Sequence, residues 1–128
     1  VGSAQMAEFS PEPYLDGVDR GETKNGLPHG RGGVRSDVFS YEGEWRDGMR
    51  SGKGTLKTTD AIYQGEWNAD QRNGDGIETL LLPGLTVRYE GSWFKGKKNG
   101  HGTLRISNGT IYEGEWQDGC KHGQGVEV

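Results

Sequence analysis

The feature that most constrains the fold is a pattern of glycine and aromatic residues that recurs along the chain. Tyr41, Gly43 and Trp45 are followed by Gly52 and Gly54. Later copies of this pattern begin at Tyr63, Tyr89 and Tyr112. The four copies start at positions 41, 63, 89 and 112, which are 22, 26 and 23 residues apart. Repetition at a period of this size indicates an array of similar structural units.

Composition supports an array of β-structure rather than helices or an ordinary layered domain. Glycine accounts for 24 of the 128 residues, and hydrophobic residues make up only 30% of the chain. Glycine at this frequency disfavours long helices, because each one costs about 1 kcal/mol in a helix interior. So few aliphatic residues cannot fill a two-layer core. Disorder is the alternative for a glycine-rich chain, but aromatic residues in fixed register with the glycines argue against it.

Each copy is expected to form a β-hairpin, because its aromatic residues and glycines alternate with polar residues. With residues 47–50 as the loop, the aromatic residues and glycines of both strands share one face. The expected opposite pairs are Trp45 with Gly52, Gly43 with Gly54, and Tyr41 with Leu56. Because glycine has no Cβ, Gly52 and Gly54 would form a floor on which Trp45 and neighbouring rings lie flat. Half-burial of one Trp contributes about 2–3 kcal/mol.

The links between copies differ in length but keep this face assignment. An even loop centred on Thr59–Asp60 and a three-residue loop at Ser107–Gly109 both return the next tyrosine to the aromatic face. In the longest copy, a type II turn at Pro83–Gly84 would place Leu82 opposite Leu85. The predicted fold is therefore all-β: an elongated single-layer antiparallel sheet of consecutive hairpins, with ten strands and two open edges. One expected contact is unfavourable, because Glu66 would oppose Asp75.

The chain divides into an N-terminal arm and the array. Residues 1–18 are predicted to be a flexible arm, beginning with an apparent tag remnant at residues 1–3. The array covers residues 19–128. Its first unit, 19–40, is degenerate because Asp19 and Thr23 occupy the positions of Tyr and Trp. The full units are 41–62, 63–88, 89–111 and 112–128.

The sequence Tyr-Glu-Gly-Glu-Trp at 41–45, with Gly-x-Gly-x-Leu downstream, resembles the MORN (membrane occupation and recognition nexus) repeat. The departures from the pattern are Asp70 at a turn glycine, Ser92 at the second Glu, and a Leu-rich insertion at 80–87. The resemblance implies non-catalytic scaffolding, partner docking, frequent homodimers and association with phospholipid in eukaryotic cells. It also implies a cytoplasmic location, with the cytoskeleton or a membrane as the site of association. Similar arrays accompany enzymatic domains, so a regulatory module of a larger enzyme is a further alternative.

Catalytic, metal and nucleic-acid sites are not indicated. The formal net charge of −4 argues against nucleic-acid binding. The segment 48–55 resembles a phosphate-binding loop, but its spacing is one residue short and the repeat explains its glycines. Cys120 and His122 are too few for a structural zinc site, which needs four ligands. Asn108 begins a glycosylation sequon that is better explained as a hairpin turn. We therefore expect no enzyme activity, no cofactor and no metal.

Two surfaces remain as candidate binding sites. The first is a half-exposed aromatic groove that would receive an extended or helical segment of a protein partner or of a second copy. Its expected anchors are Tyr41, Trp45, Tyr63, Trp67, Tyr89, Trp93, Tyr112 and Trp116. The second is a basic rim in the loops after the tryptophans, which would bind anionic phospholipid. Its residues are Arg46, Arg50, Arg72, Lys95, Lys97, Lys98 and Lys121. The open end strands offer a further route, by strand pairing.

Overall fold

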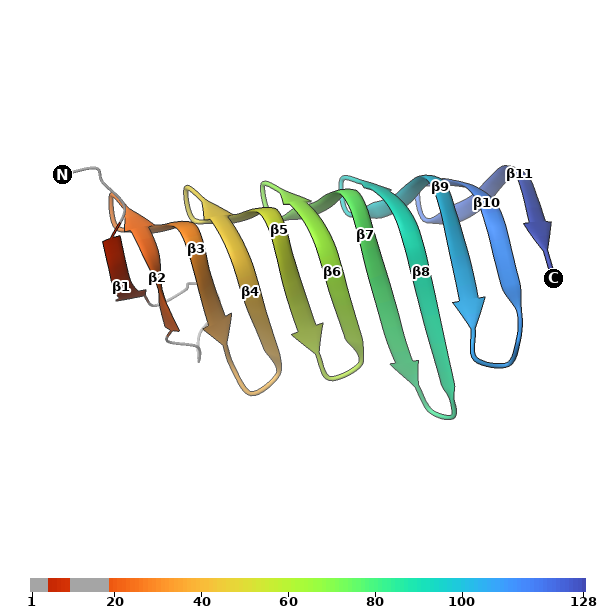
Figure 1. Ribbon diagram of the computed structural model, residues 1–128, viewed down its shortest axis with the longest axis horizontal. Coiled ribbons are helices and arrows are strands. Elements are labelled where there is room, and N and C mark those ends of the chain that lie inside the picture. The colour runs from red at the N-terminus through yellow and green to blue at the C-terminus, as the bar shows by residue number, and fades with distance from the viewer. Residues whose placement is uncertain (1–4, 10–18) are drawn as a thin grey trace.

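The computed structural model describes the backbone of residues 5–9 and 19–128 and the side chains of residues 21–128. These residues form one open sheet of eleven antiparallel strands, in which each strand pairs with its neighbours in chain order (Figure 1). The strands are β1 (Gln5–Phe9), β2 (Asp19–Lys24), β3 (Leu27–Arg35), β4 (Phe39–Arg46), β5 (Met49–Thr58), β6 (Ala61–Asn68), β7 (Gln71–Leu82), β8 (Leu85–Phe94), β9 (Lys97–Ile106), β10 (Ile111–Gln117) and β11 (Cys120–Glu127). The predicted single-layer array of hairpins is confirmed.

The first strand corrects the expectation of ten strands, and it places residues 5–9 of the predicted flexible arm in the sheet. Gln5–Phe9 pairs antiparallel with β2, from Gln5 opposite Thr23 to Phe9 opposite Asp19. This strand has no Tyr-x-Gly-x-Trp pattern, so the repeat gave no signal for it. An edge strand presents unpaired N–H and C=O groups, which allows β2 to accept another strand. The expected tag remnant at residues 1–3 lies outside the described residues.

The hairpin turns are shorter than expected. Arg46 pairs with Met49, so the loop is the two-residue turn Asp47–Gly48, with φ values of 50° and 82°. Positive φ at both positions is typical of a type I′ turn, whose twist matches that of the flanking strands. Residues 51–53 then bulge opposite the single residue Glu44. The turns of this kind are Asn25–Gly26, Asp47–Gly48, Ala69–Asp70, Lys95–Gly96 and Asp118–Gly119.

The shorter turn changes the partner of the tryptophan within each hairpin. Trp45 pairs with Arg50, and not with Gly52 as predicted. The other two predicted pairs, Gly43 with Gly54 and Tyr41 with Leu56, are present. Gly52 instead lies in the bulge, where its φ is +66°. The expected contact of Glu66 with Asp75 is also absent from the register, because the equivalent bulge removes Glu66 from the β6–β7 ladder.

One glycine from each of the strands β2 to β11 joins a row that crosses the sheet. The row consists of Gly21, Gly32, Gly43, Gly54, Gly65, Gly76, Gly91, Gly102, Gly114 and Gly125. A Cβ added at Gly54 would overlap the ring of Tyr41, and each later unit repeats this arrangement. The predicted floor is thus confirmed for Gly54 but not for Gly52, and Tyr41 rather than Trp45 rests on it.

The links between hairpins follow the predicted register. Leu56 pairs with Tyr63, and Leu104 pairs with Tyr112. In the longest hairpin, Leu82 pairs with Leu85 around Pro83–Gly84. The tip of β7–β8 consequently projects beyond the neighbouring hairpins (Figure 1). This projection carries the insertion at 80–87 and its leucines.

Candidate functional site

The eight predicted aromatic anchors form one continuous ladder along the sheet. Each tyrosine ring meets the tryptophan of its own unit and, up to Tyr89, the tryptophan of the next unit. Tyr41, for example, lies 5.1 Å from Trp45 and 5.6 Å from Trp67, measured between ring centroids. All seven ring contacts are edge-to-face, with interplanar angles of 80–89°. This arrangement is favoured by the ring quadrupoles and links neighbouring units directly.

The polar atoms of these rings bind backbone carbonyls. The Tyr41 hydroxyl donates to the carbonyl of Glu44 at 2.9 Å, next to the bulge. The indole N–H of Trp67 donates to the carbonyl of Gly54 at 3.1 Å, in the preceding unit. The same two bonds recur in the later units. Each Tyr therefore fixes the bulge of its own hairpin, while each Trp fixes the distance to the hairpin before it.

The expectation that the aromatic groove is half-exposed is wrong. All eight rings are 7% exposed or less, and three of the tyrosines are at 1% or below. Burial raises the pKa of the Tyr63 and Tyr89 hydroxyls to about 12, which keeps them protonated as donors; the nearby Arg72 cation acts in the opposite direction on the pKa of Tyr63. The rings form the core of the array. Direct contact between these rings and a partner stays a prediction, but little ring surface is accessible for it.

Part of the predicted basic rim covers the rings. Because Trp45 pairs with Arg50, the basic residue at this position shares the aromatic face. The Arg50 guanidinium lies 4.4 Å from the Trp67 ring centroid, and Arg72 and Lys98 lie over rings in the same way. Such contacts are attractive because a cation meets the negative face of the ring. Lys121 lies over Tyr112 at 4.7 Å. The predicted rim is therefore divided. Some of its residues lie on the face of the sheet that carries the rings, which we call the ring face. The others lie at the edge formed by the two-residue turns, which we call the turn edge.

Two of these cations share a carboxylate that replaces a leucine. Glu78 occupies the position of Leu56 and Leu104, beside Tyr63 and Tyr89 in the register. Its carboxylate lies 2.6 Å from Arg72 Nη1 and 3.4 Å from Lys98 Nζ. The Glu78 side chain is 12% exposed, whereas those of Arg72 and Lys98 are each 21% exposed. The acid is thus the most buried of the three groups, and the two cations are somewhat more exposed.

An aliphatic strip continues the ring face toward the tip of the long hairpin. Along one row of the register, Ala61 pairs with Leu80, Leu80 with Val87, and Val87 with Ile106. The tip adds a second, shorter row. We define the aliphatic strip as Ala61, Leu80, Leu82, Leu85, Val87 and Ile106. All six side chains remain partly or largely exposed, so this strip, and not the rings, is the accessible apolar surface of the face.

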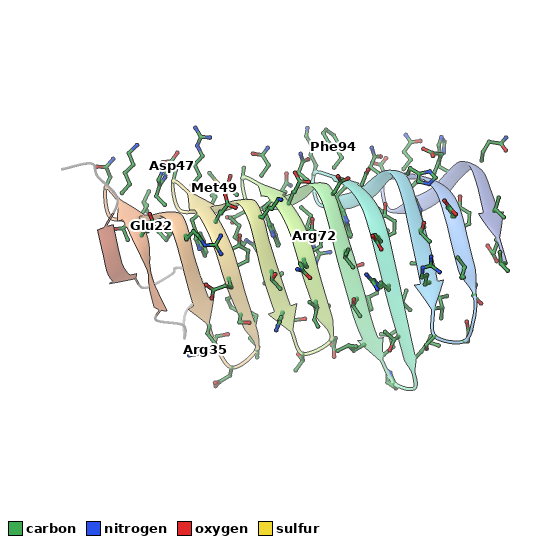
Figure 2. All side chains as sticks on the ribbon, viewed as in Figure 1. Glu22, Arg35, Asp47, Met49, Arg72 and Phe94 are labelled. Carbon is green, nitrogen blue, oxygen red and sulfur yellow. The ribbon has the colours of Figure 1, made fainter. Side chains whose placement is uncertain are left out.

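The turn edge carries the rest of the predicted rim together with apolar side chains. Figure 2 shows Asp47 and Phe94 at this edge, with Arg35 toward the opposite edge. Phe94 is 52% exposed, and Leu27 and Met49 are also exposed. The exposed basic residues at this edge are Lys24, Arg46, Lys95 and Lys97. Sequence reasoning missed the apolar members, because each is a single residue beside a turn.

The polar face shows why most units carry a second glutamate. The Glu44 carboxylate accepts the backbone N–H of Lys53, in the bulge, at 3.2 Å, and Glu66 accepts that of Asp75 at 3.1 Å. Between units, Lys53 pairs with Glu66, whereas Asp75 pairs with Ser92. The serine that departs from the repeat therefore avoids placing two acids opposite each other.

A shallow cavity of about 540 Å³ lies on the polar face over the glycine row, between Arg31 and Asp75. Polar residues line its walls, among them Glu42, Lys53 and Gln64. In residues 21–128, no group of three His, Cys, Asp or Glu side chains could hold a metal ion. Cys120 is exposed. Within the described chain there is also no helix of the length and apolarity needed to cross a membrane.

The family comparison agrees with this architecture. A family model described as the MORN repeat matches residues 20–33, 41–60, 63–80, 89–111 and 112–128. The matched segments include the degenerate unit and the four full copies. No curated protein matches the sequence.

Proposed function

Because the chain belongs to the MORN repeat family, we propose that it is a non-catalytic scaffold that docks a segment of a partner protein on its aliphatic strip. The ring ladder then acts as the rigid support of the docking surface rather than as the anchor. The end strands of the sheet add a second route, because an edge strand has unpaired N–H and C=O groups.

One observation carries this proposal: the rings of the ladder are buried, but the side chains of the aliphatic strip beside them are partly or largely exposed to solvent. The rings are buried, cations of the same and the preceding hairpins lie over several of them, and no other element of the described chain packs over the ring face. Leu82, at the projecting tip, is 45% exposed. Contiguous exposed apolar side chains of this kind are typical of interaction sites. Docking here would not require the core of the array to open.

The strip offers a closely matched pair of variants. Leu81 and Leu82 are adjacent, each is 45% exposed, and they lie on opposite faces of β7 because successive strand residues alternate. We expect Leu82→Ser to remove a partner from a cytosolic pull-down, with the bound proteins identified by mass spectrometry. Leu81→Ser should retain it. An identical set of proteins bound by the wild type and both variants would contradict docking on this strip.

A second candidate function, binding to anionic phospholipid, is favoured by the turn edge. There, Phe94 and Met49 are exposed beside Arg46, Lys95 and Lys97. Basic residues near an anionic membrane surface contribute about 1 kcal/mol each, and apolar tips can enter the interface. Arg50, Arg72 and Lys98 are partly withdrawn onto the rings, so they contribute less than the sequence suggested.

Vesicle sedimentation tests this second function. With vesicles of phosphatidylcholine and phosphatidylserine at low salt, the double variant Lys95→Glu/Lys97→Glu should lose binding. Lys57→Glu is the matched control, because Lys57 is exposed near the opposite end of the strands. If wild-type protein stays in the supernatant at low salt, the membrane function is excluded.

A further inference from the structure

We infer that the occupant of the aliphatic strip is an amphipathic helix with acidic side chains along one flank. This inference rests on the proposed docking function and specifies the chemistry of the partner. It follows from the shape of the strip and from the charge along its border.

The strip has the dimensions of a helix rather than of a second sheet. Its main row, Ala61, Leu80, Val87 and Ile106, crosses the four strands from β6 to β9. At about 4.8 Å per strand, this row is about 15 Å long, which ten residues of helix would span. Across its width the strip has only two rows, separated by about 7 Å along the strands. A helix about 10 Å in diameter fits this width, whereas a packed sheet needs a broad apolar face.

A second copy of the described chain would not supply this occupant. Residues 5–9 and 19–128 contain no helix, and a sheet packed face to face would need a broader apolar face than the two rows of the strip. The partner is therefore a different helical segment, presenting leucine-like side chains at helical spacing.

The border of the strip on the turn side is cationic. Arg72 and Lys98 share the single carboxylate of Glu78, so the three groups carry a net charge of +1. Glu78 is the most buried of the three, and the two more exposed side chains are N–H donors. Arginine has five such donors, and its bond to Glu78 uses one. At the opposite border, the tip residues Pro83 and Gly84 are uncharged. Acidic side chains on only one flank of the helix would match this asymmetry.

Two synthetic helical peptides of about 14 residues test this inference. They share a leucine face and differ in one flank, which carries Glu in one peptide and Lys in the other. We measure binding to the full 128-residue chain by fluorescence anisotropy. The Glu peptide should bind about tenfold more tightly than the Lys peptide, and the preference should shrink at high salt because the border cations are partly exposed.

Variants assign the binding to the strip and its border. Leu82→Ser should weaken both peptides, whereas Leu81→Ser should not. Lys98→Gln should reduce the preference for Glu, whereas Lys57→Gln, which removes an exposed cation from the other face, should leave it unchanged. Far-ultraviolet circular dichroism of each variant checks that the sheet is retained.

The failures of the two proposals are distinguishable. Equal binding of both peptides, or tighter binding of the Lys peptide, would overturn the acidic flank. Absence of binding by either peptide would overturn the helical occupant. In each case, loss of a pull-down partner with Leu82→Ser but not with Leu81→Ser would still support docking on the strip.

Discussion

The hairpins β4–β5 and β6–β7 show two ways of building the same unit. The first has a glycine in its turn and Leu56 beside the ring ladder. The second has Asp70 in the turn and Glu78 beside the ladder. Both nevertheless keep the two-residue turn, the bulge, the glycine pair and the edge-to-face rings.

The difference shows that the unit depends on its backbone and rings, while other positions can change if a neighbour compensates. Asp70 adopts a φ of +67°, and its carboxylate accepts two hydrogen bonds from Arg50 of the preceding hairpin. Glu78 is compensated by two cations, one of which, Lys98, lies in the following hairpin. Each of these departures from the repeat is therefore compensated at least in part by a residue of a neighbouring unit.

The largest expected effect is one that the two hairpins share. Gly54→Ala and Gly76→Ala each place a Cβ into a buried tyrosine ring, so each should lower the free energy of unfolding by about 3 kcal/mol. Urea unfolding followed by tryptophan fluorescence measures this loss. Gly96→Asn is the control, because its turn position has open space and asparagine tolerates positive φ. Costs that differ severalfold between the first two variants would contradict a common backbone requirement.

The turn of β6–β7 separates the role of conformation from that of the side chain. Asp70→Ala should cost about 2 kcal/mol, because alanine is strained at positive φ and the bonds to Arg50 are lost. Asp70→Gly should cost about 1 kcal/mol or less, since glycine relieves the strain and loses only the bonds. The same urea titration compares them. If glycine proved as costly as alanine, backbone conformation would have no part in the effect.

The pair Asp75 and Ser92 tests compensation across the polar face. Ser92→Glu restores the repeat residue but places two acids opposite each other, which should cost about 0.5–1 kcal/mol. In an Asp75→Lys background, the same Ser92→Glu change should become neutral or stabilising. A double-mutant cycle of thermal unfolding measures the coupling free energy between the two positions. A coupling free energy of zero would contradict this explanation of the serine.

The smallest expected effect is the pH dependence of the corresponding pair in β9–β10. His101 lies 3.0 Å from a Glu115 oxygen and 3.5 Å from a Glu113 oxygen, and these hydrogen bonds raise its pKa above 6.5. A raised folded-state pKa stabilises the fold at low pH, and this stabilisation is lost as pH rises through the folded-state value. The melting temperature of the wild type relative to His101→Gln should therefore fall between about pH 6 and pH 8. As a control, the melting temperature of the wild type relative to Lys53→Gln should show no comparable trend in this pH window.

Local pattern was sufficient for much of the fold but not for its surface. The alternation of residue types along each strand predicted that Tyr41, Gly43 and Gly54 share one face. The even or odd number of residues in each link predicted the register, including that at Pro83–Gly84. The turn length could not be predicted, because a bulge adds residues to one strand without changing the face of the next glycine. This bulge turned Arg50 onto the rings and removed the expected exposed groove.

By itself, the sequence determined the repeat, the single antiparallel layer and the identity of the core rings, since these follow from residue periodicity and from the absence of a Cβ at glycine. The tertiary structure alone decided which surfaces are accessible, because exposure depends on contacts between units. Arg72 and Lys98 reach Glu78 from different hairpins, and the tip leucines project because adjacent hairpins are shorter. Neither relation can be read from any one copy of the repeat.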